Sequence, residues 1–244
     1  MPELTFLPSL LLAAFVHGAF GFGFPLVATP LLALQTDLRT AVLLTLIPTV
    51  AINLFSILGE RHWRAALRAY WPIPAFTVVG SVAGTQLLLS VDPEPFRLLL
   101  ALVLVAYLVS DRFHKAEREH LVPPWGMALF GLCLGLLAGV VNVFAPLIIV
   151  YSLYTRMPAQ LMVATFNLSF LTSKSGQIGG FVLHGSFDPA VVKLTLVLLP
   201  LVLLALWLGI RIRRRIAVDA YRRLLRIALW VIAVLLVGDW ARRL

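Results

Sequence analysis

The sequence predicts an all-α integral membrane protein with about eight membrane segments in two inverted repeats, each opening with a broken or re-entrant helix pair. Of its 244 residues, 61% are hydrophobic and 13% are charged, whereas soluble domains are about half apolar and about a quarter charged. Apolar stretches recur from Leu4 to Val237 with short polar breaks between them, and about 20 apolar residues span a bilayer. We therefore expect one compact membrane domain.

Six stretches have the composition of complete membrane spans. They are residues 40–58, 67–89, 96–109, 159–182, 190–210 and 224–237. The apolar stretch that opens the chain has no basic segment before it and no small-residue cleavage site after it, so we expect it to remain in the mature protein.

Two longer apolar stretches, 4–34 and 121–154, are interrupted by glycine and proline at 18–25 and 139–146. Hydrocarbon cannot satisfy the backbone groups that such interruptions free. Irregular backbone is therefore tolerated only where it faces protein or a water-filled cavity. Each stretch is predicted to be a pair of half-helices.

The basic residues of the loops favour half-helix pairs that return to the side from which they entered. If both pairs cross the membrane, the basic residues split nine against ten and give no orientation; if both re-enter, fourteen lie on one side and five on the other. The five are Arg39, Arg97, Lys193, Arg242 and Arg243. The re-entrant arrangement leaves three spans in each half, which inverts the second half relative to the first and places both termini outside.

The two halves, predicted as repeats 1–120 and 121–244, resemble one another in sequence. Segment 30–32 aligns with 146–148, which carries Gly23 onto Gly139. The same order of matches continues through the later helices and indicates an internal duplication. Inverted halves that each contain a broken helix are typical of secondary transporters, whose substrate site lies near the midplane of the bilayer.

The glycine-rich break followed by Pro-Leu-Leu, the Ala41-Val42-x-x-Thr45 start of the next helix and the Gly80-x-x-x-Gly84 pattern resemble the sulfite exporter TauE/SafE family over nearly the full chain. The resemblance implies transport of small sulfur oxyanions or organic sulfonates, such as sulfite, sulfoacetate or taurine-related compounds, in a bacterial inner membrane. Both breaks depart from the family's commoner Gly-Gly-Gly type, which leaves the exact ligand open. We assign Gly80 and Gly84 to helix packing.

Lys174 is the exceptional charged residue, because it lies about fifteen residues into the predicted span 159–182. A lysine at the bilayer centre costs about 2.5–3.5 kcal/mol on insertion scales. We expect Lys174 to attract a substrate anion; the alternative is that its long stem carries the charge to the interface. All eleven carboxylates fall in loops or at span ends, which disfavours a cation transporter or a carboxylate proton relay.

The other candidate substrate-binding residues are small and polar, or glycines in the breaks. They are Thr165, Asn167, Ser169 and Gln177 around Lys174, Thr45 and Asn53 in the equivalent helix of the first half, and Asn142, Gly21, Gly23 and Gly139 in the breaks. Spacings of three or four residues are expected to put several polar groups on one helix face, as a cavity lining. For each alone, hydrogen bonding to a neighbouring helix is the alternative.

The breaks can bind an anion through their backbone. A half-helix N-terminus presents unpaired N–H groups and a partial positive charge, which suits an oxyanion, and glycine would let the ligand approach closely. His17 precedes the first break. It is the candidate for proton coupling, although a hydrogen-bonded core histidine is the commoner role.

The sequence thus predicts a multi-pass secondary transporter that moves a small anion, an organosulfonate or sulfite, across the cell inner (cytoplasmic) membrane by alternating access. An anion channel and a carrier of a different small organic solute are the alternatives. No nucleotide-binding glycine loop is present, so we expect the energy to come from an ion or solute gradient or from a partner, with a proton or sodium as the candidate coupling ion. We expect no enzymatic activity, cofactor, bound metal or nucleic-acid partner; Cys133 is the single cysteine. Oligomeric state and direction of transport stay open.

Overall fold

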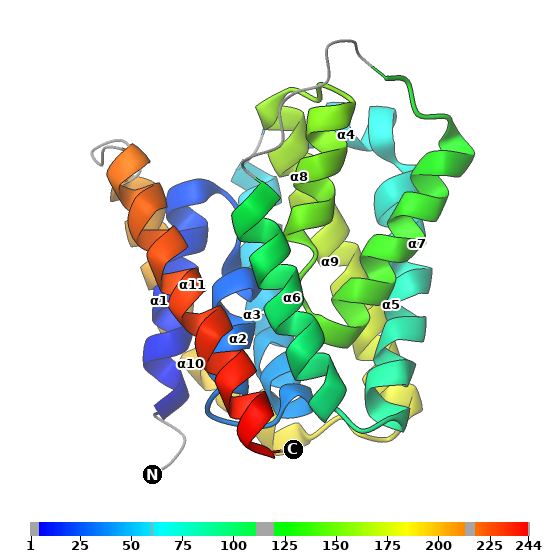
Figure 1. Ribbon diagram of the computed structural model, residues 1–244. Helices are drawn as coiled ribbons and strands as arrows, with labels where there is room; N and C mark the ends of the chain where they lie inside the picture. Colours follow the sequence, from blue (N-terminus) through cyan, green and yellow to red (C-terminus); the bar gives the residue numbers. More distant parts are fainter. Residues whose placement is uncertain (1–4, 60, 111–119, 213–217, 244) are drawn as a thin grey trace.

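The computed structural model describes residues 5–59, 61–110, 120–212 and 218–243, and all regular structure in these ranges is helical (Figure 1). The helices are α1 (Leu7–Phe20), α2 (Phe24–Ala33), α3 (Leu38–Gly59), α4 (Trp63–Tyr70), α5 (Pro72–Ser90), α6 (Glu94–Ser110), α7 (Pro124–Val141), α8 (Ala145–Tyr154), α9 (Ala159–Leu183), α10 (Pro189–Ile212) and α11 (Val218–Arg243). The predicted all-α class is confirmed.

Both broken stretches are hairpins that return to the end from which they start. At the first, the Gln35 amide after α2 donates to the Ser9 hydroxyl in α1 over 2.8 Å. At the second, the ring of His120 before α7 stacks on Tyr154 at the end of α8, with ring centroids 4.2 Å apart. The re-entrant arrangement is therefore confirmed.

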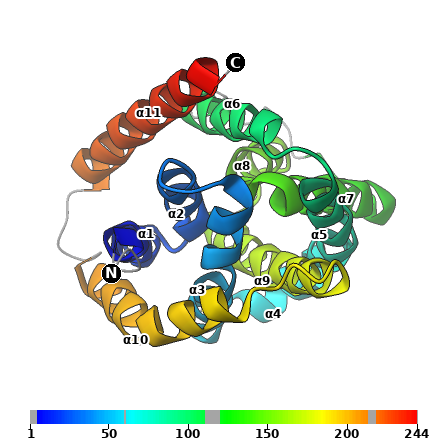
Figure 2. The same cartoon turned by 90° about the horizontal axis from the view of Figure 1, so that it is seen from below.

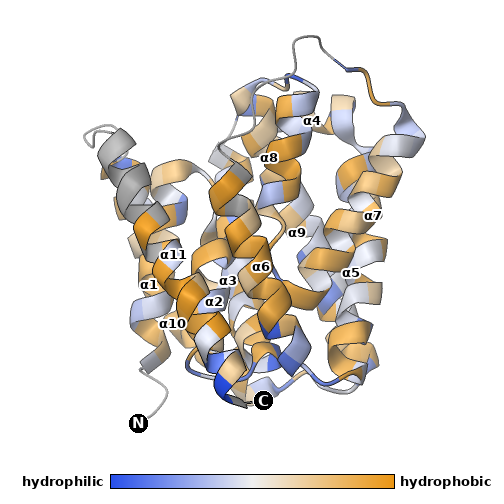
Figure 3. Ribbon diagram, in the orientation of Figure 1, coloured by the Kyte–Doolittle hydropathy of each residue, from blue (hydrophilic) through white to orange (hydrophobic). Residues whose placement is uncertain are grey.

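The helices α3, α5, α6, α9, α10 and α11 run between the two ends of the bundle, and both chain termini lie at the same end (Figure 1). Arg97 at the start of α6 holds that end together, since its guanidinium bonds the Asp239 carboxylate in α11 and the carbonyl of Thr36. Hydrophobic residues cover the helices along their length, with hydrophilic ones gathered mainly near the ends (Figure 3).

Among the described helices, α3, α5, α7 and α10 have the length and hydropathy needed to cross a membrane, as judged from these two properties alone. The predicted number of about eight membrane segments stays a prediction.

The predicted span 67–89 begins too early. Its first residues belong to the separate short helix α4, and α5 starts at Pro72. Proline is favoured in the first helical turn because its missing N–H would have no partner there. In α4, the exposed Arg64 and Arg68 lie one turn apart, opposite the buried Ala66, which is the pattern of a helix at a polar interface.

The sequence alignment of the two breaks is also corrected. The first half-helix pair breaks after Gly21 and resumes with Pro25 in the second position of α2; the second breaks after Asn142 and resumes with Pro146 in the second position of α8. Pro25, five residues before Pro30, is therefore the counterpart of Pro146. The first residues of α3 and α9, 38 and 159, are 121 residues apart, which is also the separation of Pro25 and Pro146.

Each half holds the broken helix of the other. The helix α5 packs against α7 and α9, and α10 packs against α1 and α3 (Figure 2). Glycines allow the backbones to touch: a Cβ on Gly84 would lie 2.2 Å from the carbonyl oxygen of Leu136 in α7, and one on Gly18 would lie 2.2 Å from that of Leu206 in α10. The packing role predicted for Gly80 and Gly84 is confirmed, because Gly80 meets the carbonyl of Leu132 in the same way.

We expect Gly84→Ala to lower the midpoint of thermal unfolding in detergent. The added methyl group cannot be placed without moving the α7 backbone, and overpacking of this kind costs about 1–3 kcal/mol. Gly179→Ala in α9 is the matched control, because nothing lies within 4 Å of its added Cβ. Equal midpoints for the two variants would contradict the tight α5–α7 contact.

Candidate functional site

Lys174 of α9 is fully buried, and its ammonium group donates to the side-chain oxygens of Asn142 and Gln177. The alternative that its charge reaches the interface is therefore wrong. In the described part of the chain no carboxylate forms an ion pair with Lys174; the ion pairs found there belong to Arg97. Neutral oxygens alone surround a buried cation.

Asn142 connects this lysine to the first half of the molecule. It has the left-handed backbone conformation (φ 62°) that ends α7, which asparagine tolerates better than most residues. Its amide nitrogen donates to the hydroxyls of Thr29 in α2 and Thr45 in α3, over 2.8 and 2.7 Å. We call Lys174, Asn142, Gln177, Thr29 and Thr45 the lysine centre.

Gln177 ties the lysine centre to the end of α7. Its amide nitrogen donates over 2.9 Å to the carbonyl of Ala138, which also accepts the backbone N–H of Asn142. The helix α8 begins at Ala145, three residues after Asn142. The dipole of α8 adds partial positive charge at the second break, although Pro146 in its first turn has no N–H. The centre therefore combines the Lys174 ammonium group with the N-terminus of a half-helix at the second break.

The first break has a different set of polar contacts. Asn167 of α9 donates to the carbonyl of Gly21 over 3.0 Å. His17 accepts the backbone N–H of Phe24 at Nδ1 over 3.3 Å, and its Nε2 lies 3.1 Å from the Ser56 hydroxyl in α3. His17 thus caps the first N–H of α2 and is a hydrogen-bonded core histidine. A role for it in proton coupling stays a prediction.

Gly23 is the N-cap residue directly before α2 and has a φ of 106°. No atom lies within 4 Å of the position that a Cβ on Gly23 would take. This glycine therefore leaves open space beside the first break. Gly139 differs, because its Cβ would lie 2.6 Å from the Ser81 carbonyl oxygen in α5. Close helix packing accounts for Gly139.

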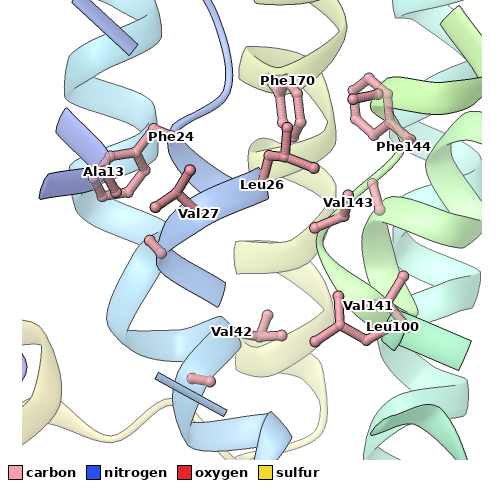
Figure 4. Packing of buried hydrophobic residues seen from close by; sticks show 14 of the residues in the cluster. Ala13, Phe24, Leu26, Val27, Val42, Leu100, Val141, Val143, Phe144 and Phe170 are labelled. Carbon is pink, nitrogen blue, oxygen red and sulfur yellow. The ribbon is translucent and has the colours of Figure 1, made fainter. Parts of the chain in front are cut away.

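Four phenylalanine rings join the two breaks. Phe22 of the first break lies 4.8 Å from Phe166 of α9, measured between ring centroids, and Phe144 of the second break lies 5.5 Å from the same ring. Phe170 stacks on Phe144 at 4.0 Å, as Figure 4 shows. We call Phe22, Phe144, Phe166 and Phe170 the aromatic cluster.

The polar residues of α9 divide between two faces. Asn167 and Gln177 share the face of Lys174, whereas Thr165 is nine residues from Lys174, which is about half a turn away at 3.6 residues per turn. Thr165 and Ser169 lie on the stripe that continues to Gly176, and Gly176 packs against Ser81 of α5. The single polar face expected for α9 is therefore not found.

Asn53 of α3 is fully buried, and its amide nitrogen donates a hydrogen bond to the Thr49 carbonyl over 2.7 Å.

The sequence interpretation missed two residues that take part in the polar contacts of the breaks, Thr29 and Ser56. Thr29 is the one polar side chain in α2, which was a usable signal. Ser56 follows Asn53 by three residues and carried no such signal.

A family model described as sulfite exporter TauE/SafE matches residues 6–236 of the chain. No curated protein and no solved structure was found to match the chain.

Replacing Asn142 by glycine tests the lysine centre without disturbing the backbone, because glycine adopts a positive φ readily. We expect the variant to lose about 1–3 kcal/mol of stability, since Lys174, Thr29 and Thr45 each lose a hydrogen-bond partner in a buried site. Thermal unfolding in detergent measures the loss. An unchanged midpoint would show that the Asn142 side chain does not hold the centre together.

Proposed function

The chain belongs to the sulfite exporter TauE/SafE family and is a membrane transporter, and we propose that it carries a small anion, an organosulfonate or sulfite, by binding it at the lysine centre. The observation that carries this proposal is the burial of Lys174 among neutral oxygens. A buried cation is stabilised most strongly by a counter-ion. A substrate anion provides that counter-ion only while it is bound, which favours selection by charge.

Sulfonate and sulfite suit the donors at this position. An ammonium group has three N–H donors, and two of those on Lys174 go to amide oxygens. The third donor of Lys174 is available for an oxygen of an anion; in the first turn of α8, Pro146 has no N–H and the Leu147 N–H donates to the Phe144 carbonyl, so this turn contributes mainly through its helix dipole. A tetrahedral or pyramidal oxyanion offers several acceptors at once, whereas a neutral solute leaves the lysine charge uncompensated.

Alternating access follows from the arrangement of the halves. The breaks meet through the aromatic cluster and through Asn142, and each broken helix is held by a crossing helix of the other half. Rocking of the halves exposes the lysine centre to one side and then the other. The end that carries Arg64 and Arg68 faces the cytoplasm of a bacterial cell, because basic loops stay inside.

We expect sulfite or a sulfonate to raise the midpoint of thermal unfolding of the purified protein. A ligand at 100 times its dissociation constant adds about 2.7 kcal/mol. The panel contains sulfite, sulfate, thiosulfate, sulfoacetate, taurine, small carboxylates and amines. The shift is expected to disappear in Lys174→Met, because the counter-charge is gone.

Lys193→Met is the matched control, since Lys193 lies exposed in α10 and loses the same charge away from the centre. It is expected to keep the full anion shift. Stabilisation by amines alone would overturn the anion proposal. So would an undiminished anion shift in Lys174→Met.

An anion channel is the competing function, and counterflow separates the two. Proteoliposomes loaded with unlabelled substrate are expected to accumulate labelled substrate transiently, because a carrier exchanges bound substrate at one alternating site. A channel produces only passive equilibration. The absence of a transient overshoot, together with rates that do not saturate, would rule out the carrier.

A further inference from the structure

The two breaks occupy corresponding places in the fold but differ in chemistry. Gly21 and Asn142 both end the first half-helix in the left-handed conformation, 121 residues apart. The same separation places Asn53 where the second half has Lys174, and Ser56 where it has Gln177. The first break therefore has a neutral amide in the position of the lysine.

Two amide oxygens near the first break have no hydrogen-bond partner in the described part of the chain. They are the Oδ1 atoms of Asn53 and Asn167, whose residues are 0% and 1% exposed. The orientation of each side-chain amide is set by the hydrogen bonds of its nitrogen. The nitrogen of Asn53 donates to the Thr49 carbonyl, and that of Asn167 donates to the carbonyls of Val163 and Gly21. Leaving such a buried acceptor unsatisfied is destabilising, so each oxygen calls for a donor or a cation.

The packing of α3 on α9 brings the two amides to the same level. The helices run antiparallel: Thr45 lies at the level of Lys174 through Asn142, and Ile57, three turns later, packs with Ala164 and Leu168. Asn53 stands one turn before Ile57, and Asn167 stands next to Leu168. Asn167 contacts the first break at Gly21, and Asn53 lies three residues before Ser56, which contacts His17 in α1.

The first break, like the second, joins the C-terminus of one half-helix to the N-terminus of the next. The last carbonyls of α1 point toward it, and a helix C-terminus carries a partial negative charge. At the second break Gln177 caps the corresponding carbonyl of Ala138. Ser56, in the place of Gln177, is too short for this and lies against His17 instead. Gly23 leaves open space at the first break.

We propose that the first break binds a monovalent metal cation, sodium, through the Oδ1 atoms of Asn53 and Asn167 and the carbonyl end of α1. Amide and carbonyl oxygens are hard ligands, and a set without a carboxylate suits a single rather than a double positive charge. Broken helices of secondary transporters coordinate sodium with unwound carbonyls and half-helix C-termini. Resting on the proposed function, this inference makes sodium the coupling ion for the anion at the lysine centre.

The test is thermal unfolding of the full-length protein in detergent with sodium chloride replaced stepwise by choline chloride, so that ionic strength and chloride stay constant. The wild type is expected to show saturable stabilisation by sodium. Asn53→Leu is expected to weaken the apparent sodium affinity about tenfold or more, because about 1.4 kcal/mol of lost interaction corresponds to that factor. Asn53→Asp keeps the oxygen and adds a negative charge, and is expected to tighten sodium binding.

Gln86→Leu is the matched control, because Gln86 is a half-buried amide of α5 that donates to the Gly180 carbonyl. It is expected to keep the wild-type sodium response. A wild type that responds equally to sodium and choline overturns the inference, and so does a sodium response that Asn53→Leu and Gln86→Leu share. If Asn53→Leu does not fold, a sodium affinity in Asn53→Asp no tighter than that of the wild type overturns it.

The anion panel keeps the two proposals apart. Stabilisation by sulfite or sulfonate that persists in Asn53→Leu shows that the lysine centre is intact, so a lost sodium response then reports on the first break alone. A sodium response without any anion response refutes the proposed function and with it the role of sodium as a coupling ion.

Discussion

The hydrogen bonds that Lys174 gives to Asn142 and Gln177 connect most of the features that define this molecule. An ammonium group in the interior of a membrane bundle needs acceptors, and the second break supplies them because its chain leaves the helix at Asn142. The same asparagine then reaches Thr29 and Thr45 in the other half. One buried charge thereby fixes the end of α7, the position of α9 and the contact between the halves.

Breaking a helix in a membrane frees backbone groups, and the two breaks meet this requirement in different ways. Gln177 satisfies a carbonyl of α7, Asn167 satisfies that of Gly21, and His17 accepts the first free N–H of α2. These side chains come from α9 and α1, so each break is completed by a neighbouring helix. The result is a cationic centre at one break and a centre rich in acceptors at the other.

The sequence was sufficient for the order of the long helices and for the two broken pairs, because apolar length and glycine or proline interruptions act locally, but it did not separate the short helix α4 from α5. Charge counting was sufficient for the re-entrant hairpins, and the hydrogen bond between Ser9 and Gln35 agrees with it. Site residues were harder to assign, since Thr165 and Ser169 differ from Asn167 only in which neighbour their face meets. That neighbour is α5, whose position depends on the fit of Gly176 against Ser81, and no periodicity within α9 contains this information.

The aromatic cluster is a packing contact that connects the two breaks. In the aromatic cluster, Phe166 contacts both Phe22 and Phe144. Phe166 belongs to α9, which also carries Lys174 and Asn167, so the aromatic cluster connects both breaks to the helix that holds these residues. Because packed rings have discrete arrangements and do not deform continuously, the cluster favours two positions of the breaks over a graded series. Such two-state behaviour is what exchange of a single site between two sides of a membrane requires.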